Sequence, residues 1–464
     1  MTGSVNLCAA VVSNAIFLNG SSISGDVILR CSRIDGQLNL LGARVANKLD
    51  MDSVTIGGSA LLSEGAEFSD IVLRGAHITG QLALIRASVS ANLTMNLIAI
   101  QGPLFLRESG FDGNIQLVGA KIEGQLEASG AKIKGKLDMN GASITDSLLI
   151  HGGAEAAEIN LVGANIGTQV TLDRSKITGA LRMNGARVGQ SVFVRGAELQ
   201  REIDLAFANI GGNLDMRATT FADVDLAGAR VKGELRLASP TLLPTWKTGA
   251  ELKLRNTRLD CLLDRPDAWP IKVDLHGFTY GRFGGFGIDA EAAISARGTK
   301  WFTDWLAKSE PYTPQPYQQC AKVLRGMGHP EMGDEVLYAG RERERKEALR
   351  SGNNQRATGL LFLKLFVGYG YGRRMLWHPL GWVIGMTVVG TAILHLTGIP
   401  AEPTGSLVTP SFFSFDLLLP VIQLYEPHYK VVLEGFAKYY FAFHKLMGYM
   451  LASFLIPGLA GLTK

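Results

Sequence analysis

The chain has 464 residues, which is enough for two or three domains, and its formal net charge of +4 is close to neutral. Its four cysteines form no Cys-x-x-Cys pair, which argues against zinc or iron–sulfur sites and a disulfide framework, and fits a reducing compartment. The first thirty residues do not resemble a signal peptide, so we expect the N-terminal half to stay in the cytoplasm unless an internal segment exports it.

From about Leu7 to Leu237 the sequence repeats with a period of eleven residues. The clearest copies begin at Gly119, Gly130 and Gly141 and read GAKIEGQLEAS, GAKIKGKLDMN and GASITDSLLIH. A short, fixed period is typical of stacked and nearly identical units, so it predicts a solenoid.

Within each repeat, small or apolar residues alternate with polar ones, as in a strand with one buried face. In the first copy we expect four inward-facing residues: Ala120, Ile122, Leu126 and Ala128. Because eleven is odd, one residue per repeat must turn a corner, and the leading glycine can do this at low cost. Two repeats would form one coil of about 22 residues, and roughly ten coils spaced ~4.8 Å apart would form a rod about 50 Å long.

A helical solenoid with the same period is disfavoured, because a glycine at every fifth or sixth position costs about 1 kcal/mol each in a helix. The pattern resembles the pentapeptide-repeat family, most closely at Ala164–Ile166 and Ala208–Ile210, and this resemblance implies a four-sided β-helix. The period of eleven instead of ten implies a wider or bulged wall. Residues 1–240 carry 21 basic and 23 acidic side chains, too even a balance for mimicry of DNA, and we expect no nucleic-acid partner.

The strand pattern is already present at Ser4–Leu7. An open solenoid end needs a cap. The sequence therefore leaves three explanations open: a further upstream portion, end-to-end association of copies into a homo-oligomer, or an unusual start site.

The repeat weakens after Pro240, and the last expected coil is Glu251–Leu263. We therefore predict a mostly β chain, with a β-helix at 1–263, a transition or hinge at 264–290 that includes the glycine-rich Gly281–Gly287, and a helical hairpin at 291–350. A basic juxtamembrane segment follows at 351–379, in which Thr358–Val367 is expected to form an interfacial helix on the inner leaflet.

Residues 380–464 are predicted to form a membrane domain with two transmembrane helices. Leu380–Ile399 has twenty residues without a formal charge, and Leu446–Leu462, extended back through Tyr439–Phe443, is the second expected span. His444 and Lys445 are unfavourable there unless they snorkel or lie at the boundary. The expected membrane-interface residues are Arg373, Arg374, Trp377, Trp382 and Lys445.

Nine basic residues lie between Arg341 and Arg374, before the first span, whereas the loop between the spans has only Lys430 and Lys438. The positive-inside rule then predicts a solenoid and two chain termini in the cytoplasm, with the loop on the outer side.

Two segments could suggest a channel. Val367–Gly370 matches the letters of a potassium filter, but it precedes the first span, so a glycine-rich hinge with an interfacial tyrosine is favoured. Phe412–Leu424 lies between the spans and fits either a re-entrant pore helix or, with Asp416 solvated, an amphipathic helix on the outer face. The candidate residues of this pore or outer-face helix are Phe412, Phe415, Asp416 and Pro420.

No enzyme signature is present: the eight histidines are dispersed, and no zinc, nucleophile-elbow, P-loop or dinucleotide fingerprint occurs in the right context. We therefore assign no catalytic or metal-binding residue and no cofactor. Asp138 and Asp215 alternate with apolar residues and are expected to face outward from their strands.

Much of the C-terminal half resembles a bacterial family commonly labelled membrane-associated oxidoreductase. The resembling segments are Asp264–Tyr280, Pro314–Leu324, Val336–Arg345, Val367–Tyr371, Phe415–Pro420 and Gly458–Leu462. With the repeats, the similarity covers nearly the whole chain and implies a bacterial inner-membrane protein. The label implies redox activity, but no residue here stands out as binding a flavin or nicotinamide.

Three hypotheses follow. The leading one is a membrane-tethered scaffold or sensor whose solenoid walls bind a protein partner. The second is an oligomeric two-span channel or effector gated by the solenoid. The third is a membrane-associated oxidoreductase, as the family label suggests.

Overall fold

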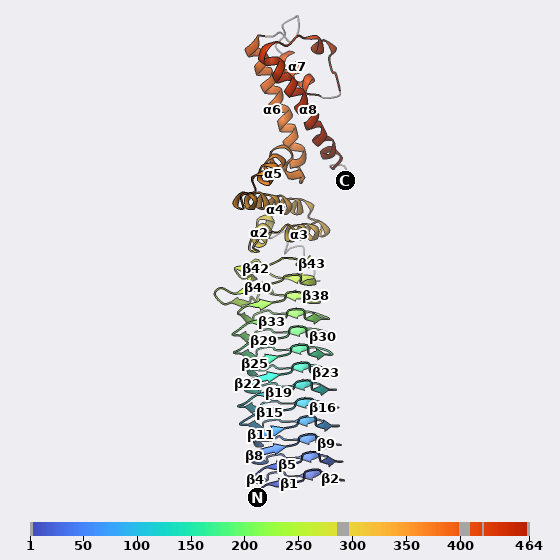
Figure 1. The fold of residues 1–464 in the computed structure, drawn as a ribbon, viewed down its shortest axis with the longest axis vertical. Helices are drawn as coiled ribbons and strands as arrows, with labels where there is room; N and C mark the ends of the chain where they lie inside the picture. The colour runs from blue at the N-terminus through green and yellow to red at the C-terminus, as the bar shows by residue number, and fades with distance from the viewer. Residues whose placement is uncertain (1–2, 285–296, 399–408, 420–421, 462–464) are drawn as a thin grey trace. The chain divides into compact units, whose positions relative to one another are not determined.

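The structure is a computed structural model that describes residues 3–284, 297–398, 409–419 and 422–461. The chain divides into two compact units, Met1–Pro311 and Tyr312–Lys464, and each is described by itself. The first unit is a parallel β-solenoid of about 13 turns, which confirms the predicted solenoid (Figure 1).

Each eleven-residue repeat forms two short strands of one wall, and the next repeat forms the opposite wall. The repeat at Gly119 supplies β20 (Lys121–Ile122) and β21 (Leu126–Glu127), and the following one supplies the longer β22 (Lys132–Asp138). β20 pairs in parallel with β23 (Ser143–Ile144), so Lys121 lies beside Ser143, 22 residues later. Two repeats therefore make one coil, as predicted, and the walls are parallel sheets of 20 and 23 strands.

Most of the strands have two residues, and both walls also contain longer, bent strands. These are β8 (Arg44–Asp50), β11 (Glu67–Val72), β22, β25 (Glu155–Asn160), β38 (Arg230–Arg236) and β41 (Arg258–Leu263). The pairing starts at β1 (Val5–Asn6), whose partner is β5 (Val27–Ile28).

A residue with positive φ turns each corner, at intervals of close to eleven residues. Gly119, Gly130 and Gly141 have φ of +65°, +66° and +63°, which confirms the turning role expected of the leading glycine. Other residues occupy the same place elsewhere: Ala9, Cys31, Ser53, Glu64, Arg86, Leu97, Glu108, Arg174, Phe207, Ala218 and Asn256.

The bore is filled by the two columns that the alternation predicts. The leading alanines and the aliphatic residues two positions later are almost completely buried; Ala120 and Ile122 are 0% and 1% exposed. Because each side chain stacks on its equivalent one coil away, one continuous core runs through the solenoid.

The second glycine of many repeats lies where one coil approaches the next. A Cβ atom at Gly189 would lie 2.0 Å from the carbonyl oxygen of Gly167, and one at Gly211 would lie 2.1 Å from that of Gly189. These glycines are therefore required by close backbone approach and not by a positive φ.

The solenoid continues beyond Leu263, where the sequence predicted its last coil. After a 3-10 turn, η1 (Pro266–Ala268), strand β42 (Lys272–Asp274) pairs with β40 (Glu251–Lys253), and β43 (Thr279–Phe283) pairs with β41. Insertions after Pro240 and Leu263 break the period of eleven, which hides this coil in the sequence. The expected hinge at 264–290 is thus partly solenoid, and residues 285–290 lie outside the described residues.

Helix α2 (Gly298–Ala307) packs against this last coil. The Trp305 ring centroid lies 5.1 Å from that of Trp269, and Phe302 lies 5.1 Å from Phe283. Phe302, Trp305 and Leu306 are buried, so α2 caps the C-terminal end of the β-core.

The second unit is helical. Its elements are α3 (Gln315–Gly326), α4 (Pro330–Arg350), α5 (Asn354–Val367), η2 (Gly368–Gly370), α6 (Arg374–Thr397), α7 (Thr409–Leu418), η3 (Glu426–Lys430) and α8 (Gly435–Gly461). α3 and α4 form a hairpin within the range where one was expected, whereas α2 of that range belongs to the solenoid unit. α6, α7 and α8 pack together as a bundle.

Among the described residues, one helix, α6, is long and apolar enough to cross a membrane. Only 17% of its most apolar stretch is buried, unlike the core helix of a soluble protein. α8 is continuous over Tyr439–Phe443 and over the expected second span as far as Gly461. A second membrane crossing remains a prediction.

Candidate functional site

Three of the expected interface residues are tied to α4 or α5: Arg373, Arg374 and Trp382. Arg374 is 2.6 Å from Glu335 and its guanidinium lies 4.2 Å from the Tyr338 ring, whereas the Arg373–Glu331 pair is largely exposed. Trp377 is 62% exposed. The Trp382 indole donates to the carbonyl of Leu365 at 3.0 Å and stacks on Phe366. Exposed tryptophan next to paired arginine is typical of a membrane boundary.

The segment that matches a potassium filter is a helix end. α5 stops at Val367, Gly368 has a φ of +56°, and Tyr369 has a φ of +60°. The Tyr369 hydroxyl, which belongs to a mostly buried side chain, donates to Glu342 of α4 at 3.0 Å. This tyrosine therefore fixes a turn between α5 and α6.

Glu342 is the centre of the contact between α4 and α5. It accepts hydrogen bonds from Arg345 at 2.6 Å, Lys364 at 3.0 Å and Tyr369. Partial burial opposes ionisation, but these hydrogen bonds and the charge of Lys364 outweigh it and hold the pKa of Glu342 at about 2. Glu342 is consequently a permanent anion at neutral pH and fastens α5 to α4.

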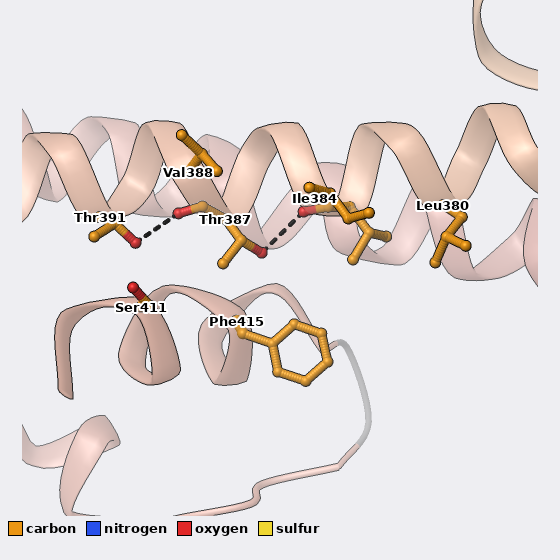
Figure 2. A pocket seen from close by; sticks show the side chains of 8 residues that line it. Leu380, Ile384, Thr387, Val388, Thr391, Ser411 and Phe415 are labelled. Carbon is orange, nitrogen blue, oxygen red and sulfur yellow. Dashed lines mark hydrogen bonds between the residues drawn. The ribbon is translucent and has the colours of Figure 1, made fainter. Parts of the chain in front are cut away.

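A groove of about 390 Å³ lies between α6 and α7 (Figure 2). Figure 2 shows Ser411 and Phe415 of α7 on the side that faces α6. On α6, the Thr387 hydroxyl donates to the carbonyl of Val383 and the Thr391 hydroxyl donates to the carbonyl of Thr387, both at 2.8 Å. Aliphatic side chains form most of the remaining lining, and Ile384 and Val388 at its edge are 59% and 63% exposed. The groove suits an apolar chain.

Asp416 is not solvated, contrary to the expectation made for it as part of an outer-face helix. Its side chain is fully buried and accepts hydrogen bonds from the backbone N–H groups of Leu424 at 2.8 Å and Tyr425 at 3.3 Å. His428 donates from Nδ1 to the same carboxylate at 2.8 Å. Asp416 therefore pins the segment after α7 back onto that helix, which no local pattern predicts.

His428 is fully buried within an aromatic enclosure. The ring centroids of Phe412, Phe413 and Tyr425 lie 5.1, 5.1 and 4.9 Å from that of His428. Its Nε2 has no hydrogen-bond partner within the described part of the chain. The four candidate residues of the pore or outer-face helix therefore do not form one site. Phe412 and Asp416 contact His428, and Phe415 lines the groove between α6 and α7. Pro420 lies outside the described residues.

A second buried polar group lies in the same bundle. His444 donates from Nε2 to the carbonyl of Ser414 at 2.9 Å and lies 3.2 Å from the Tyr440 hydroxyl through Nδ1. His444 is therefore satisfied inside the bundle and does not snorkel, whereas Lys445 is exposed, with its ammonium 5.5 Å from the Tyr429 ring. Gly390 permits this packing, because a Cβ atom there would lie 2.1 Å from Ser414 Oγ.

On the solenoid, Asp215 is also buried, although it occupies an outward-facing strand position. Arg217 covers it at 2.6 Å and Arg236 lies 3.8 Å away. Asp138 is partly exposed and pairs with Lys136 at 2.9 Å. Both carboxylates are engaged in ion pairs, which fits a structural role.

Within the described residues, no group of three or more His, Cys, Asp or Glu side chains is arranged to hold a metal ion. No protein-family model, curated protein or solved structure matches the chain.

Proposed function

We propose that this protein is a membrane-anchored scaffold or sensor, with α6 and α8 as the two spans in the bilayer and the solenoid as a binding surface for a protein partner. The main support is the uncovered apolar face of α6, where Ile384 and Val388 are more than half exposed. α8 also exposes large apolar residues, including Phe436, Tyr439 and Leu446. Exposed apolar area of this kind is costly in water and favourable in lipid.

The solenoid suits the binding role by its geometry. Its parallel coils repeat outward-facing side chains at intervals of ~4.8 Å, so a partner can contact equivalent positions on several coils. Outward charges on neighbouring coils often pair, as Arg44 with Glu67 and Arg182 with Glu158 do, both at 2.6 Å. Specific contacts therefore have to come from places where this pairing is interrupted.

We place the anchor in the bacterial inner membrane, with the solenoid and both termini in the cytoplasm. The basic residues before α6 and the scarcity of basic residues after it support this orientation. The exposed apolar side chains of α5, such as Phe362 and Leu365, fit an interfacial helix on the same leaflet.

Extraction with alkaline carbonate tests the anchor. The natural chain should remain in the membrane pellet, and Ile384→Asp with Val388→Asp should release it, because each mid-span aspartate costs about 2.5–3.5 kcal/mol on an insertion scale. The matched control is Ile271→Asp, since Ile271 is 83% exposed in the solenoid unit. Equal release of the natural chain and the double variant would contradict the proposal.

An oligomeric channel is the second candidate, and the buried Asp416, His428 and His444 favour it. Polar residues inside a membrane bundle often mark an ion pathway. Ion flux through proteoliposomes, compared between the natural chain and Asp416→Asn, separates this function from scaffolding. Flux that depends on Asp416 would support the channel.

The redox alternative predicts a bound cofactor. The visible absorbance of the detergent-purified protein, followed by analysis of a denatured extract, tests it. A stoichiometric flavin, haem or quinone would place this alternative first.

A further inference from the structure

One corner of the solenoid is built differently from its neighbours. Phe207 occupies a corner position with a φ of +58°, whereas the equivalent residues one coil before and after are Gly185 and Gly228. A phenylalanine in this left-handed region is strained. The residue is nevertheless 73% exposed, so the strain is not compensated by burial.

The Phe207 ring lies over Gly228, which leaves it room. A Cβ atom at Gly228 would lie 2.6 Å from the Phe207 ring. The result is a groove of about 370 Å³, lined by the ring, the flanking glycines and the adjoining wall of the second sheet. An exposed aromatic ring in a groove is a frequent anchor for a binding partner.

Basic side chains border this groove on the adjoining wall. The parallel register places Arg187, Asn209 and Arg230 side by side on three successive coils, and Arg258 follows on the next. All four are exposed. Within the described part of the chain, the three arginines form no ion pair, in contrast to the paired columns elsewhere on the solenoid.

The surrounding charges limit what can bind. Across the corner, Asp204 and Asp225 accept the backbone N–H groups of Ala206 and Ala227 at 3.0 and 2.8 Å, and Asp260 is exposed beyond Arg230. A long polyanion would have to pass these carboxylates, whereas a short segment with two acidic side chains can stay on the basic side.

We propose that the Phe207 groove binds a short acidic peptide segment, in which two carboxylates contact Arg187 and Arg230 and an apolar side chain between them packs on Phe207. Arg187 and Arg230 are two coils apart, on the order of 10 Å. Carboxylates three residues apart in a polyproline II chain match this spacing, because three residues make one turn at ~3.1 Å each and place the two side chains on the same side. Guanidinium–carboxylate contacts supply charge-assisted hydrogen bonds. This inference rests on the proposed function of the solenoid as a binding surface and names its partner chemistry.

Fluorescence anisotropy on the full-length protein in detergent tests the proposal. The probe is a labelled eight-residue peptide containing Glu-Leu-Ala-Glu, compared with a version carrying glutamine for both glutamates. A labelled twelve-nucleotide oligothymidylate is the rival probe. We expect saturable binding of the acidic peptide that weakens with salt, at least tenfold weaker binding of the glutamine version, and weaker binding of the oligonucleotide.

Variants with matched controls locate the site. Arg187→Gln with Arg230→Gln should weaken peptide binding at least tenfold, and Phe207→Gly at least fivefold. Leu97→Gly is the control for Phe207, because Leu97 is also an exposed corner residue with positive φ, and Lys121→Gln is the control for the arginines, since Lys121 lies in the same register column. Both controls should change binding less than twofold.

Phe207→Gly also separates binding from folding. Because glycine relieves the strained φ, this variant should unfold at the same or a higher temperature while it binds less well. Absence of saturable peptide binding, equal losses in the control variants, or tighter binding of the oligonucleotide would overturn the proposal. Carbonate extraction is independent of this groove, so membrane anchorage can hold even if the groove proposal fails.

Discussion

The carboxylate of Asp264 and the guanidinium of Arg297 lie 3.0 Å apart, and their side chains are 0% and 3% exposed. The indole of Trp269 donates to the same carboxylate at 2.6 Å. Asp264 directly follows β41, and Arg297 directly precedes α2. The ion pair therefore fastens the capping helix to the last coils of the solenoid.

Asp264→Asn should destabilise the solenoid unit by about 3–5 kcal/mol, because it leaves the buried charge of Arg297 without its partner. Denaturant unfolding followed by tryptophan fluorescence measures this loss. Asp267→Asn is the control, since the Asp267–Arg265 pair is about half exposed and is expected to contribute at most about 1 kcal/mol. Equal stability of the two variants would contradict the capping role.

Gly189→Ala should destabilise the solenoid by about 1–3 kcal/mol, because the new methyl group forces neighbouring coils apart. Gly110→Ala is the matched control: it also lies in the solenoid, its φ is not positive, and a Cβ atom there has no neighbour within 4 Å. Thermal unfolding by circular dichroism compares the two. A control loss as large as that of Gly189→Ala would show that close approach is not the cause.

The contact between α4 and α5 should weaken in acid. The folded-state pKa of Glu342 is about 2, below the ordinary value of 4.5, so its stabilising effect is present above about pH 4.5 and is lost as the pH falls towards 2. Hydrogen exchange of α5 amides, measured at pH 5 and pH 3, should show lower protection at pH 3. Glu342→Gln should reduce this pH dependence, whereas Glu347→Gln, at an exposed pair with Arg350, should leave it unchanged.

Asp416→Asn should loosen the segment that follows α7. An asparagine cannot match a carboxylate that accepts from two backbone N–H groups and from His428, so we expect a loss of about 1–3 kcal/mol in detergent. The control is Glu426→Gln, because the Glu426–Lys430 pair is more than 70% exposed. Unchanged melting of Asp416→Asn would mean that this centre does not hold the segment.

The sequence predicts the features that depend on near neighbours. The burial of Ala120 and Ile122 and the turn at Gly119 follow from alternation within a single repeat. The burial of Asp215 and Asp416 could not be predicted in this way, because it depends in part on Arg236 of the next coil for Asp215, and on residues beyond the end of α7 for Asp416. The corner position of Phe207 could be predicted, since this residue lies eight repeats after Gly119. Its exposure could not, because a hydrophobic residue in the sequence does not by itself indicate an exposed side chain.

Thiol accessibility tests the central claim, a membrane-anchored protein with a cytoplasmic solenoid. Cys8 and Cys31 are exposed on the solenoid, whereas Cys261 and Cys320 are buried. A membrane-impermeant maleimide should fail to label the natural chain in intact spheroplasts and should label it after lysis. Val432→Cys, at a residue 76% exposed between α7 and α8, should add labelling in intact spheroplasts. Labelling of Cys8 and Cys31 before lysis would contradict the account.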